Sequence, residues 1–510
     1  MSVPDRKSRS LFKWISRVTG VDACWIEGID SDDNPLWGIA KNITRKLWYI
    51  FSRRLRPALA VTALGGALLL PAQALQAQTS IELSSLNGAN GFLSTGESGN
   101  SGLALSAGDF NNDGIEDLVI GAFGASTNDG KTYIVFGQSG GFSASIDLSN
   151  LNGTNGYILN GVDTEADNSG RAVATGDING DGIDDVIIGA PKGDQPSNLD
   201  AGETYVVYGD ELANADADDA SSDGAIELAN LDGTTGFVLK GTAGGDESGR
   251  AVSAGDINGD SIDDVIIGAY GANSGAGETY VVFGKTSAFN SSIDISDLSS
   301  SEGFTLNGIT SGDQSGRAVA AADVNDDGIQ DVIIGARNAD PNGIDSGESY
   351  VVFGKTGSFG GSLDLSNLGS DGFVINGIDG GDESGQSVSS GDISGDGIDD
   401  IIIGAFHAAP NGTDSGETYV VFGKSTLGSD IELSALSSSD GFTLNGIGAY
   451  DESGYSVSSG DINNDGADDV VIGALLADPN ASASGETYVV FGGSDVGSGG
   501  TIELSSLTGD

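Results

Sequence analysis

Cysteine and histidine are almost missing from this sequence, which has one of each in 510 residues. The cysteine is Cys24, near the N-terminus, and the histidine is His407. A scaffold held by disulfides is therefore excluded, and so is thiol chemistry in the rest of the chain. Catalysis by a nucleophile paired with histidine is nearly excluded, and no group of Cys and His residues is available to attract zinc.

Basic residues and tryptophan are also scarce, and both gather at the N-terminal end. Eleven of the 21 Lys and Arg residues lie at or before Arg56, which leaves 10 against 69 Asp and Glu from Gln78 onward. All four Trp residues lie in that N-terminal stretch as well. A body this acidic repels phosphates, so we expect no nucleic-acid partner and instead expect bound cations. The change in composition indicates a boundary near residue 77.

Only one long apolar run occurs, and it lies just before that boundary. It covers residues 58–70, follows an arginine-rich flank and precedes Pro71-Ala72-Gln73-Ala74. A positive flank, a 13-residue apolar core and an Ala-x-Ala site are typical of a secretory signal with cleavage near 74–77. The run is short for a membrane span, although an uncleaved anchor helix is the alternative.

We therefore expect residues 1–77 to be a presequence that contains a signal peptide. Residues 78–510 would form the mature protein, without a membrane span. A signal of this kind predicts a secreted, cell-surface or periplasmic location.

Glycine, in contrast, is abundant at 83 residues while proline numbers 9, a balance that suits many tight turns between short strands. After residue 78 the sequence repeats six times, at spacings of 67 to 79 residues. The longest spacing contains an extra acidic stretch, 210–224. The acidic loops of the six copies begin at Asp109, Asp177, Asp256, Asp323, Asp392 and Asp461.

Each copy contains four strand-like segments joined by Gly, Asn, Asp and Ser. In the second copy these are residues 171–175, 186–188, 204–208 and 236–241, the last one helped by 226–228. No helical period is evident after residue 78. Four strands in roughly 68 residues make one blade of a propeller, so we predict an all-β chain, a β-propeller with four antiparallel strands per blade.

The acidic loop has the pattern Asp-x-Asn-x-Asp-Gly-x-x-Asp. Side-chain oxygens at positions one, three, five and nine, with the carbonyl of position seven, could surround a hard cation, and Gly at position six permits the tight turn. Oxygen ligands suit Ca²⁺, so we predict about six calcium sites and no other cofactor. The predicted ligands are Asp109, Asn111, Asp113, Ile115 and Asp117; Asp177, Asn179, Asp181, Ile183 and Asp185; Asp256, Asn258, Asp260, Ile262 and Asp264; Asp323, Asn325, Asp327, Ile329 and Asp331; Asp392, Ser394, Asp396, Ile398 and Asp400; and Asp461, Asn463, Asp465, Ala467 and Asp469.

The six loops differ in quality and have an alternative interpretation. An EF-hand carries Glu at position twelve, but here that position is Ile120, inside a strand. Ser261 replaces glycine in the third loop and Ser394 replaces asparagine in the fifth, so we expect these two sites to be the weakest. A plain Asp/Asn/Gly turn with solvated carboxylates is the alternative, and recurrence in six copies favours calcium.

These residues resemble the FG-GAP repeats of integrin α-subunit propellers and their bacterial relatives. The strongest match is the loop at 177–185 followed by Gly189-Ala190-Pro191. The resemblance covers about residues 80–510 and implies a propeller with calcium in the loops between the first and second strands. It also implies extracellular adhesion or ligand binding, although the sequence contains no Arg-Gly-Asp.

The number of blades differs from what the resemblance implies, because the integrin propeller has seven blades and this chain has six acidic loops. An Ile-x-Leu element recurs from Ile81 to Ile502, but the Gly-Phe element stops at Phe442. Residues 81–96 therefore supply a fourth strand that can complete the last blade and close the ring. We favour six blades, with a seventh, incomplete blade as the alternative.

The function that these features predict is binding. Strands alternate in direction, so the joints between the second and third strands lie on the face opposite the acidic loops, and their variable sequences make that face the expected site for a protein or glycan partner. We predict an adhesion or protein-interaction module and no enzyme. A carbohydrate-binding or carbohydrate-active propeller is the alternative, since carboxylate-based hydrolysis remains formally possible.

Overall fold

A computed structural model describes residues 81–507, apart from 97–98, 163–165, 195–197 and 218–221. The predicted presequence 1–77, with its apolar core and cleavage site, lies outside the described residues. The unit that contains the described residues spans Gln76–Asp510, and its regular structure is almost all β. Among the helices described here, none is both long enough and apolar enough to cross a membrane.

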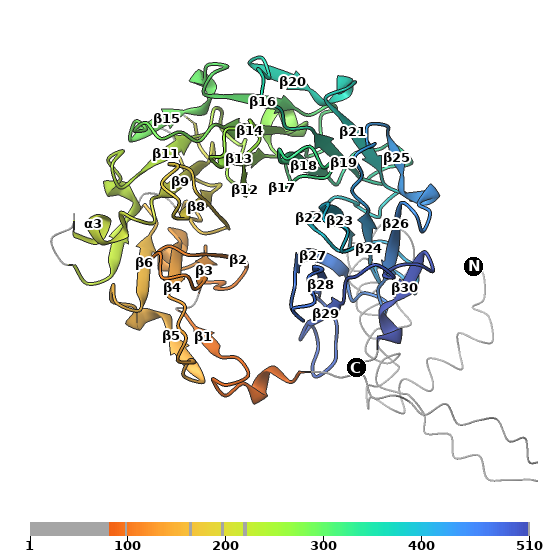
Figure 1. Cartoon of the computed structure of the whole chain (residues 1–510), viewed down its shortest axis with the longest axis horizontal. Coiled ribbons are helices and arrows are strands. Elements are labelled where there is room, and N and C mark those ends of the chain that lie inside the picture. The colour runs from red at the N-terminus through yellow and green to blue at the C-terminus, as the bar shows by residue number, and fades with distance from the viewer. Residues whose placement is uncertain (1–80, 97–98, 163–165, 195–197, 218–221, 508–510) are drawn as a thin grey trace, which may run out of the picture. The chain divides into compact units, whose positions relative to one another are not determined.

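The strands form six blades around a common centre, which confirms the predicted six-bladed β-propeller (Figure 1). In each blade the first strand lies innermost and the next strands follow outward in antiparallel order. Blade 1 contains β2 (Ala104–Gly108), β3 (Asp117–Ala122), β4 (Lys131–Val135) and β6 (Gly156–Asn160); blade 2 contains β7 (Ala172–Gly176), β8 (Asp185–Ala190), β9 (Glu203–Val207) and β11 (Gly236–Lys240); blade 3 contains β12 (Ala251–Gly255), β13 (Asp264–Ala269), β14 (Glu278–Val282) and β16 (Gly303–Asn307). Blade 4 contains β17 (Ala318–Ala322), β18 (Asp331–Ala336), β19 (Glu348–Val352) and β21 (Gly372–Asn376); blade 5 contains β22 (Ser387–Gly391), β23 (Asp400–Ala405), β24 (Glu417–Val421) and β26 (Gly441–Asn445); blade 6 contains β27 (Ser453–Gly460), β28 (Asp469–Ala474) and β29 (Glu486–Val490).

The first five blades carry a fifth strand, parallel to the fourth, at the outer edge. In blade 1 this is β10 (Ala225–Glu227), in which Ile226 pairs with Leu159 of β6. The expectation that 226–228 helps the fourth strand of its own repeat was therefore wrong, because it belongs to the preceding blade. The equivalent strands are β15 (Ser292–Asp294), β20 (Ser362–Asp364), β25 (Ile431–Glu432) and β30 (Thr501–Glu503). A 3-10 turn follows each outer strand, at Leu228–Asn230, Ile295–Asp297, Leu365–Asn367, Leu433–Ala435 and Leu504–Ser506.

The two ends of the ring carry complementary parts of one blade. Blade 6 has three strands and no fourth, whereas β1 (Leu93–Thr95) lies at the other end and pairs in parallel with β5 (Ser145–Asp147). That pairing repeats the one between a fourth strand and its outer strand, so β1 is a fourth strand without three inner neighbours. Among the described residues β1 does not pair with β29, and Figure 1 shows the ring interrupted between them. The predicted closing contact is therefore not formed.

Neighbouring blades are held together by buried apolar faces. The second strands are buried along their length, as in β8, and in blades 2 to 6 the tyrosine of the third strand, such as Tyr205, packs against the preceding blade. Five buried clusters of this kind lie between successive blades in the described part of the chain. Where the ring is interrupted, Leu105 of β2 is 59% exposed, while its counterpart Val173 is 9% exposed.

Close backbone approach also fixes how the blades pack. A Cβ atom added at Gly189, near the end of β8, would lie 2.0 Å from the carbonyl oxygen of Gly249, just before the first strand of the next blade. No side chain fits that space, so glycine is required there for steric reasons. The same approach recurs at Gly121, Gly268, Gly335 and Gly404, but not at Gly473 of blade 6.

Short helices occupy joints where the sequence predicted none. The helix α3 (Leu212–Ala217) lies within the extra acidic stretch and buries Leu212 and Ala215 against the core between blades 1 and 2. The single helical turn α4 (Ala272–Gly275) joins the second and third strands of blade 3. The remaining 3-10 turns are η2 (Leu83–Ser85), η3 (Ser126–Asn128) and η4 (Leu148–Asn150). Such short segments depend on local packing, because few residues give no clear helical period.

The interruption of the ring can be tested with two isoleucines at the same loop position. Ile257 is fully buried between blades, whereas Ile462, at the end of the ring, is 59% exposed. We expect Ile257→Ala to cost about 2–5 kcal/mol in the free energy of unfolding, and Ile462→Ala to cost less than about 1 kcal/mol. Urea unfolding would measure both. Equal losses would mean that the end of the ring is covered in solution.

Candidate metal-binding loops

Each acidic loop is curled by the side chain of its own first residue. In the second loop, Asp177 Oδ1 accepts hydrogen bonds from the amides of Gly180 and Asp181, at 2.7 and 3.0 Å, and Oδ2 accepts one from Gly182 at 2.8 Å. Asp181 Oδ1 then accepts from the amide of Ile183 at 2.8 Å. The bond from the amide of position six to the first aspartate recurs in all six loops, at 2.7–3.0 Å. The loop is thus shaped by the chain itself.

The aspartate at position nine opens the second strand and is buried. Asp185 Oδ2 accepts from the amide of Ile178, and Oδ1 accepts from the amide of Gly209, just after the third strand, both at 3.0 Å. One carboxylate therefore links the loop to the outer part of the blade. Bonds of the same kind are made by Asp117, Asp264, Asp331 and Asp469; Asp400 accepts instead from the amide of Ser394, besides that of Gly423.

Burial makes the position-nine carboxylates of the first five loops difficult to ionise. Burial raises the pKa of Asp185 to about 8, and the nearby charges of Asp181 and Asp177 act in the same direction. The pKa of Asp264 and of Asp331 is also raised to about 8, that of Asp400 to about 7 and that of Asp117 to about 6, with burial as the largest cause. Among the described residues, none of these carboxylates forms an ion pair with a Lys, Arg or His side chain.

The position-three side chain approaches the position-nine carboxylate. Asn258 Nδ2 donates to Asp264 Oδ1 at 3.1 Å, and the asparagines of the first, second, fourth and sixth loops make the same bond at 3.1–3.5 Å. In the fifth loop the hydroxyl of Ser394 is buried without a hydrogen-bond partner. The fifth loop is therefore poorer in side-chain contacts, while its rank as a calcium site stays a prediction.

The position-six residue needs a left-handed backbone. Ser261 has φ +67°, and the glycines at this position in the other five loops have φ between +81° and +91°. Nothing lies within 4 Å of a Cβ atom built on those glycines, so conformation and not space makes glycine favourable. A serine held there costs on the order of 1 kcal/mol, which weakens the third loop.

The predicted ligands are brought into one loop in each blade, but their oxygens face backbone amides. Within the described ranges, no group of three or more His, Cys, Asp or Glu side chains is arranged so that it could hold a metal ion. The assignment of calcium ligands therefore stays a prediction. A carboxylate has about four lone-pair sites, so one that accepts two or three amides still has acceptor capacity, and the oxygen donors present suit a hard cation.

One contact between neighbouring loops was not foreseen from the sequence. The residue at position eight of one loop forms hydrogen bonds with the first residue of the preceding loop. Asp263 Oδ2 accepts from the amide of Asp177 at 3.1 Å, and the amide of Asp263 donates to the Asp177 carbonyl at 3.0 Å. Gln330 does the same for Asp256 through Oε1, at 2.9 Å. The recurrence of Asp or Gln at position eight was the available signal.

A second unforeseen group is Asp210, from the extra acidic stretch. It lies near enough to Asp181 of the second loop for the two carboxylates to influence one another. Burial, followed by the charge of Asp181, raises the pKa of Asp210. The second loop therefore gains a further carboxylate, and the composition of 210–224 was the only sequence signal for it.

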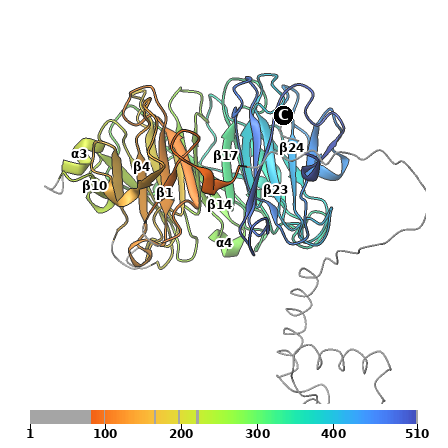
Figure 2. The ribbon, with the colours of Figure 1, turned by 90° about the horizontal axis from the view of Figure 1, so that it is seen from below.

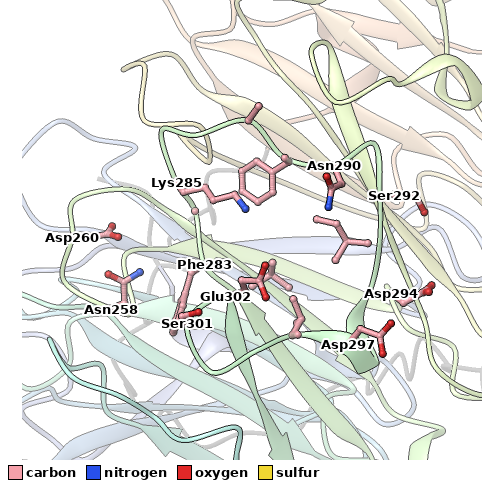
Figure 3. Close-up of a pocket in the computed structure, with 16 residues that line it drawn as sticks. Asn258, Asp260, Phe283, Lys285, Asn290, Ser292, Asp294, Asp297, Ser301 and Glu302 are labelled. Atoms are coloured by element: carbon pink, nitrogen blue, oxygen red, sulfur yellow. The ribbon is translucent and has the colours of Figure 1, made fainter.

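One cavity lies beside the third loop, on the face of the acidic loops. It has a volume of about 740 Å³ and is bounded by Asn258 and Asp260 of the loop and by the joint between the third and fourth strands of blade 3 (Figure 3). Lys285 lies over the ring of Phe289, 4.3 Å from its centre, among the carboxylates of the rim. A cavity with one ammonium and several carboxylates favours cations over anions.

The remaining sequence-selected residues have structural contacts. His407 Nδ1 lies 3.2 Å from Glu383 Oε1, and its ring packs on Phe406. In blades 2 to 6 the glutamate that opens the third strand accepts a hydrogen bond from the hydroxyl of the buried tyrosine two residues later. These pairs are Glu203 with Tyr205, Glu278 with Tyr280, Glu348 with Tyr350, Glu417 with Tyr419 and Glu486 with Tyr488.

Comparison with known proteins places the repeats in a family. Six segments match the FG-GAP repeat, each running from the start of the first strand to the third strand: residues 101–135, 169–207, 248–282, 315–352, 384–421 and 453–490. The chain is similar to phosphatidylinositol-glycan-specific phospholipase D of Bos taurus, with 30% identity over 182 residues, 35% of this chain and 20% of that protein.

Integrin α chains give longer alignments. Identity to integrin alpha pat-2 of Caenorhabditis elegans is 30% over 264 residues, which is 47% of this chain and 18% of that protein. Identity to integrin alpha-V of Gallus gallus is 26% over 252 residues, 47% of this chain and 20% of that protein. The matched region thus spans a fifth or less of the length of these three relatives.

The contact between neighbouring loops predicts different results for two substitutions at one position. Asp263→Ala leaves the amide of Asp177 without its acceptor and should cost about 1–3 kcal/mol in the free energy of unfolding. Asp263→Asn keeps an oxygen acceptor, as Gln330 does in the next blade, and should change stability by less than about 0.5 kcal/mol. Chemical unfolding of both variants measures the difference. Equal destabilisation would show that the charge of Asp263, and not its acceptor, is what matters.

Proposed function

Because the chain is an FG-GAP repeat protein with a propeller of the integrin α type, we propose that it is an exported, calcium-binding propeller that acts as an extracellular protein-interaction module. The observation that carries the proposal is the recurrence, in every blade, of a buried carboxylate beside further carboxylates with no positively charged side chain as described partner. The proposal has three parts, namely the cation, the partner face and the location.

Calcium is the cation that this arrangement suits. An unpaired charge in a low-dielectric site is costly, and it is retained when a partner or a metal compensates it. Asp177, Asp181 and Asp185 supply oxygen donors, Asn179 adds an amide oxygen, and the carbonyl of Ile183 completes the predicted set. The ion, when bound, would neutralise the charge that burial makes unfavourable, and the loop would contribute its shape.

The partner face is proposed to be the one opposite the acidic loops. Figure 2 shows the ring edge-on, with loops projecting from both faces. The joints between second and third strands differ in length and sequence, for example 270–277 in blade 3 and 337–347 in blade 4. Varied loops on a rigid scaffold are the usual place for recognition. The signal-like segment before residue 78 supports an extracellular or periplasmic location.

Protein recognition is favoured over the carbohydrate alternative by the centre of the ring. A sugar-binding or sugar-cleaving propeller would be expected to line a central pocket with Asp, Glu and aromatic residues. The central cavity is lined instead by arginines and by aliphatic residues such as Val252 and Val319. The larger acidic cavity lies at the side of blade 3. We therefore propose a binding module and no enzyme.

Calcium removal is the first test. A site at tenfold saturation adds about 1.4 kcal/mol, so six sites would add roughly 8 kcal/mol. With an unfolding entropy of about 2.1 cal/mol/K per residue over roughly 430 residues, excess EGTA should lower Tm by about 9 °C. Differential scanning calorimetry measures Tm, and elemental analysis should find about six calcium ions per chain, as the six loops predict.

The matched variants for this test are two Asp→Asn changes. Asp185→Asn should remove one ion and reduce the effect of EGTA. Asp232→Asn should leave both unchanged, because Asn152 at the same place of the preceding repeat makes the same turn bond. A purified protein without divalent ions, with an unaltered melt in EGTA, would contradict the calcium proposal.

Partner recognition is tested on arrays of immobilised extracellular proteins and glycans, with calcium or with EGTA. We expect calcium-dependent binding to a protein. Replacing the joint 337–347 by the shorter 270–277 joint of blade 3 should reduce that binding without changing the calcium content, because the acidic loops are untouched. Binding confined to glycans, or binding insensitive to exchanges of these joints, would contradict the proposed partner face.

A further inference from the structure

Three arginines gather at the centre of the ring, at the end of the inner strands away from the acidic loops. Arg171, Arg250 and Arg317 each stand immediately before the inner strand of blades 2, 3 and 4. These blades are neighbours, and the three side chains line one cavity at the central wall. They are three of only 10 basic residues after Gln78. This concentration of positive charge contrasts with the strongly negative net charge of the whole chain.

The arginines line a cavity of about 280 Å³ at the centre of the ring. Its other walls are mostly apolar and include Leu105 and Val173, and Gln386 occupies in blade 5 the repeat position that arginine has in blades 2 to 4. An inner strand of five residues places the acidic loops about 17 Å away. That separation exceeds the screening length of about 8 Å at physiological ionic strength, so the carboxylates of the loops act weakly at this cavity.

Two of the three guanidinium groups are held in place by aromatic rings, which do not neutralise them. Arg171 stacks over the ring of Phe123 at 5.3 Å, and Arg317 over that of Tyr270 at 5.5 Å, each ring coming from the preceding blade. Across the described ranges, no ion pair or side-chain hydrogen bond joins the three guanidiniums to another residue. A guanidinium stacked on a ring keeps its N–H groups, which lie in its own plane, available to an acceptor.

The acidic side chains around this cavity already have other partners. Glu247 forms an ion pair with Lys192 and accepts a hydrogen bond from the Tyr270 hydroxyl at 2.7 Å. Glu383 pairs with Arg337 at 3.2 Å. Burial, followed by the charge of a neighbouring arginine, lowers the pKa of Arg250 and of Arg317 to about 10, which reflects positive charge that the protein itself leaves poorly compensated.

We propose that Arg171, Arg250 and Arg317 form a binding site for a tetrahedral oxyanion with two negative charges, a phosphate or sulfate group. Planar guanidinium forks bind such groups through paired N–H···O bonds, and three forks on one wall supply more positive charge than a single carboxylate needs. The cavity holds a small group but is too small for a folded partner. The source can be the free anion or an ester that projects the group into the ring.

This site is independent of the proposed calcium loops, because it uses none of their residues and lies at the other end of the inner strands. Failure of calcium binding would leave it intact, and failure of anion binding would leave the calcium proposal intact. The experiment therefore keeps the calcium concentration constant and low enough that phosphate does not precipitate.

Isothermal titration of the purified full chain tests the site with inorganic phosphate, inorganic sulfate, glucose 6-phosphate and acetate, at one ionic strength. We expect one site per chain for the dianions and much weaker binding of acetate. Arg250→Gln should weaken sulfate binding by about tenfold or more, as expected for loss of a charge-assisted pair. Substitution of all three arginines by Gln should abolish it. Glutamine is the native residue at this repeat position in blade 5, so the variants should fold.

Two controls separate a site from a general effect of charge. Lys355→Gln removes an ammonium that pairs with Asp371, and Lys285→Gln removes a cation at the acidic-loop face; both should leave sulfate affinity unchanged. Sulfate should raise Tm of the wild type but not of the triple variant. The proposal is overturned if the triple variant binds sulfate as the wild type does, if acetate binds as tightly as sulfate, or if no dianion binds. Binding of glucose 6-phosphate beside phosphate assigns the source to an ester, and binding of phosphate alone assigns it to the free anion.

Discussion

A buried carboxylate at the start of every second strand is the contact on which each blade depends. The carboxylate of Asp185, for example, accepts hydrogen bonds from the amide of Ile178 in the loop and from the amide of Gly209 after the third strand. It therefore fixes the loop against the sheet. The curl of the loop has a separate origin, because Asp177 binds the amides of positions four to six. Shape and charge are therefore provided by different residues. The chain's own hydrogen bonds shape the loop without a cation, but burying a charged carboxylate at its base costs free energy.

The contacts between blades extend this local design around the ring. Position eight of one loop holds the first residue of the loop before it, and the amide that follows the third strand, such as that of Lys285, donates to the carbonyl of position two in the preceding loop. A change at one loop thus acts directly on the next. The sixth loop has no following blade among the described residues, and its Ile462 is exposed where the corresponding residues of the other loops are buried. The end of the ring is therefore the place where this chain of contacts stops.

Local features could be predicted from the sequence, and non-local ones could not. The four strands of a repeat and the left-handed backbone at Ser261 follow from patterns within a few residues, and the structure confirms them. The parallel pairing of β10 with β6 depends on which blade lies alongside. The sequence of a short Ile-x-Leu element does not indicate which strand it pairs with. The separation of β1 from β29 is also a matter of arrangement, since β1 has the sequence of the missing fourth strand. The helix α3 forms where Leu212 and Ala215 pack against the core, and a helix of six residues is too short to show a helical period in the sequence.

The few basic residues of the propeller have different environments, and the difference bears on the central arginines. Lys192, Arg337, Lys355 and Lys424 each pair with a carboxylate. The chain has 69 acidic residues after Gln78, so most basic side chains can reach a carboxylate. An arginine without such a partner lacks it because of its position in the fold. Arg171, Arg250 and Arg317 stand side by side and have aromatic and aliphatic neighbours. Like charges placed together lower one another's stability unless an anion joins them. The same electrostatic argument therefore applies at both ends of the inner strands, where acidic loops favour a cation and the central arginines favour an anion.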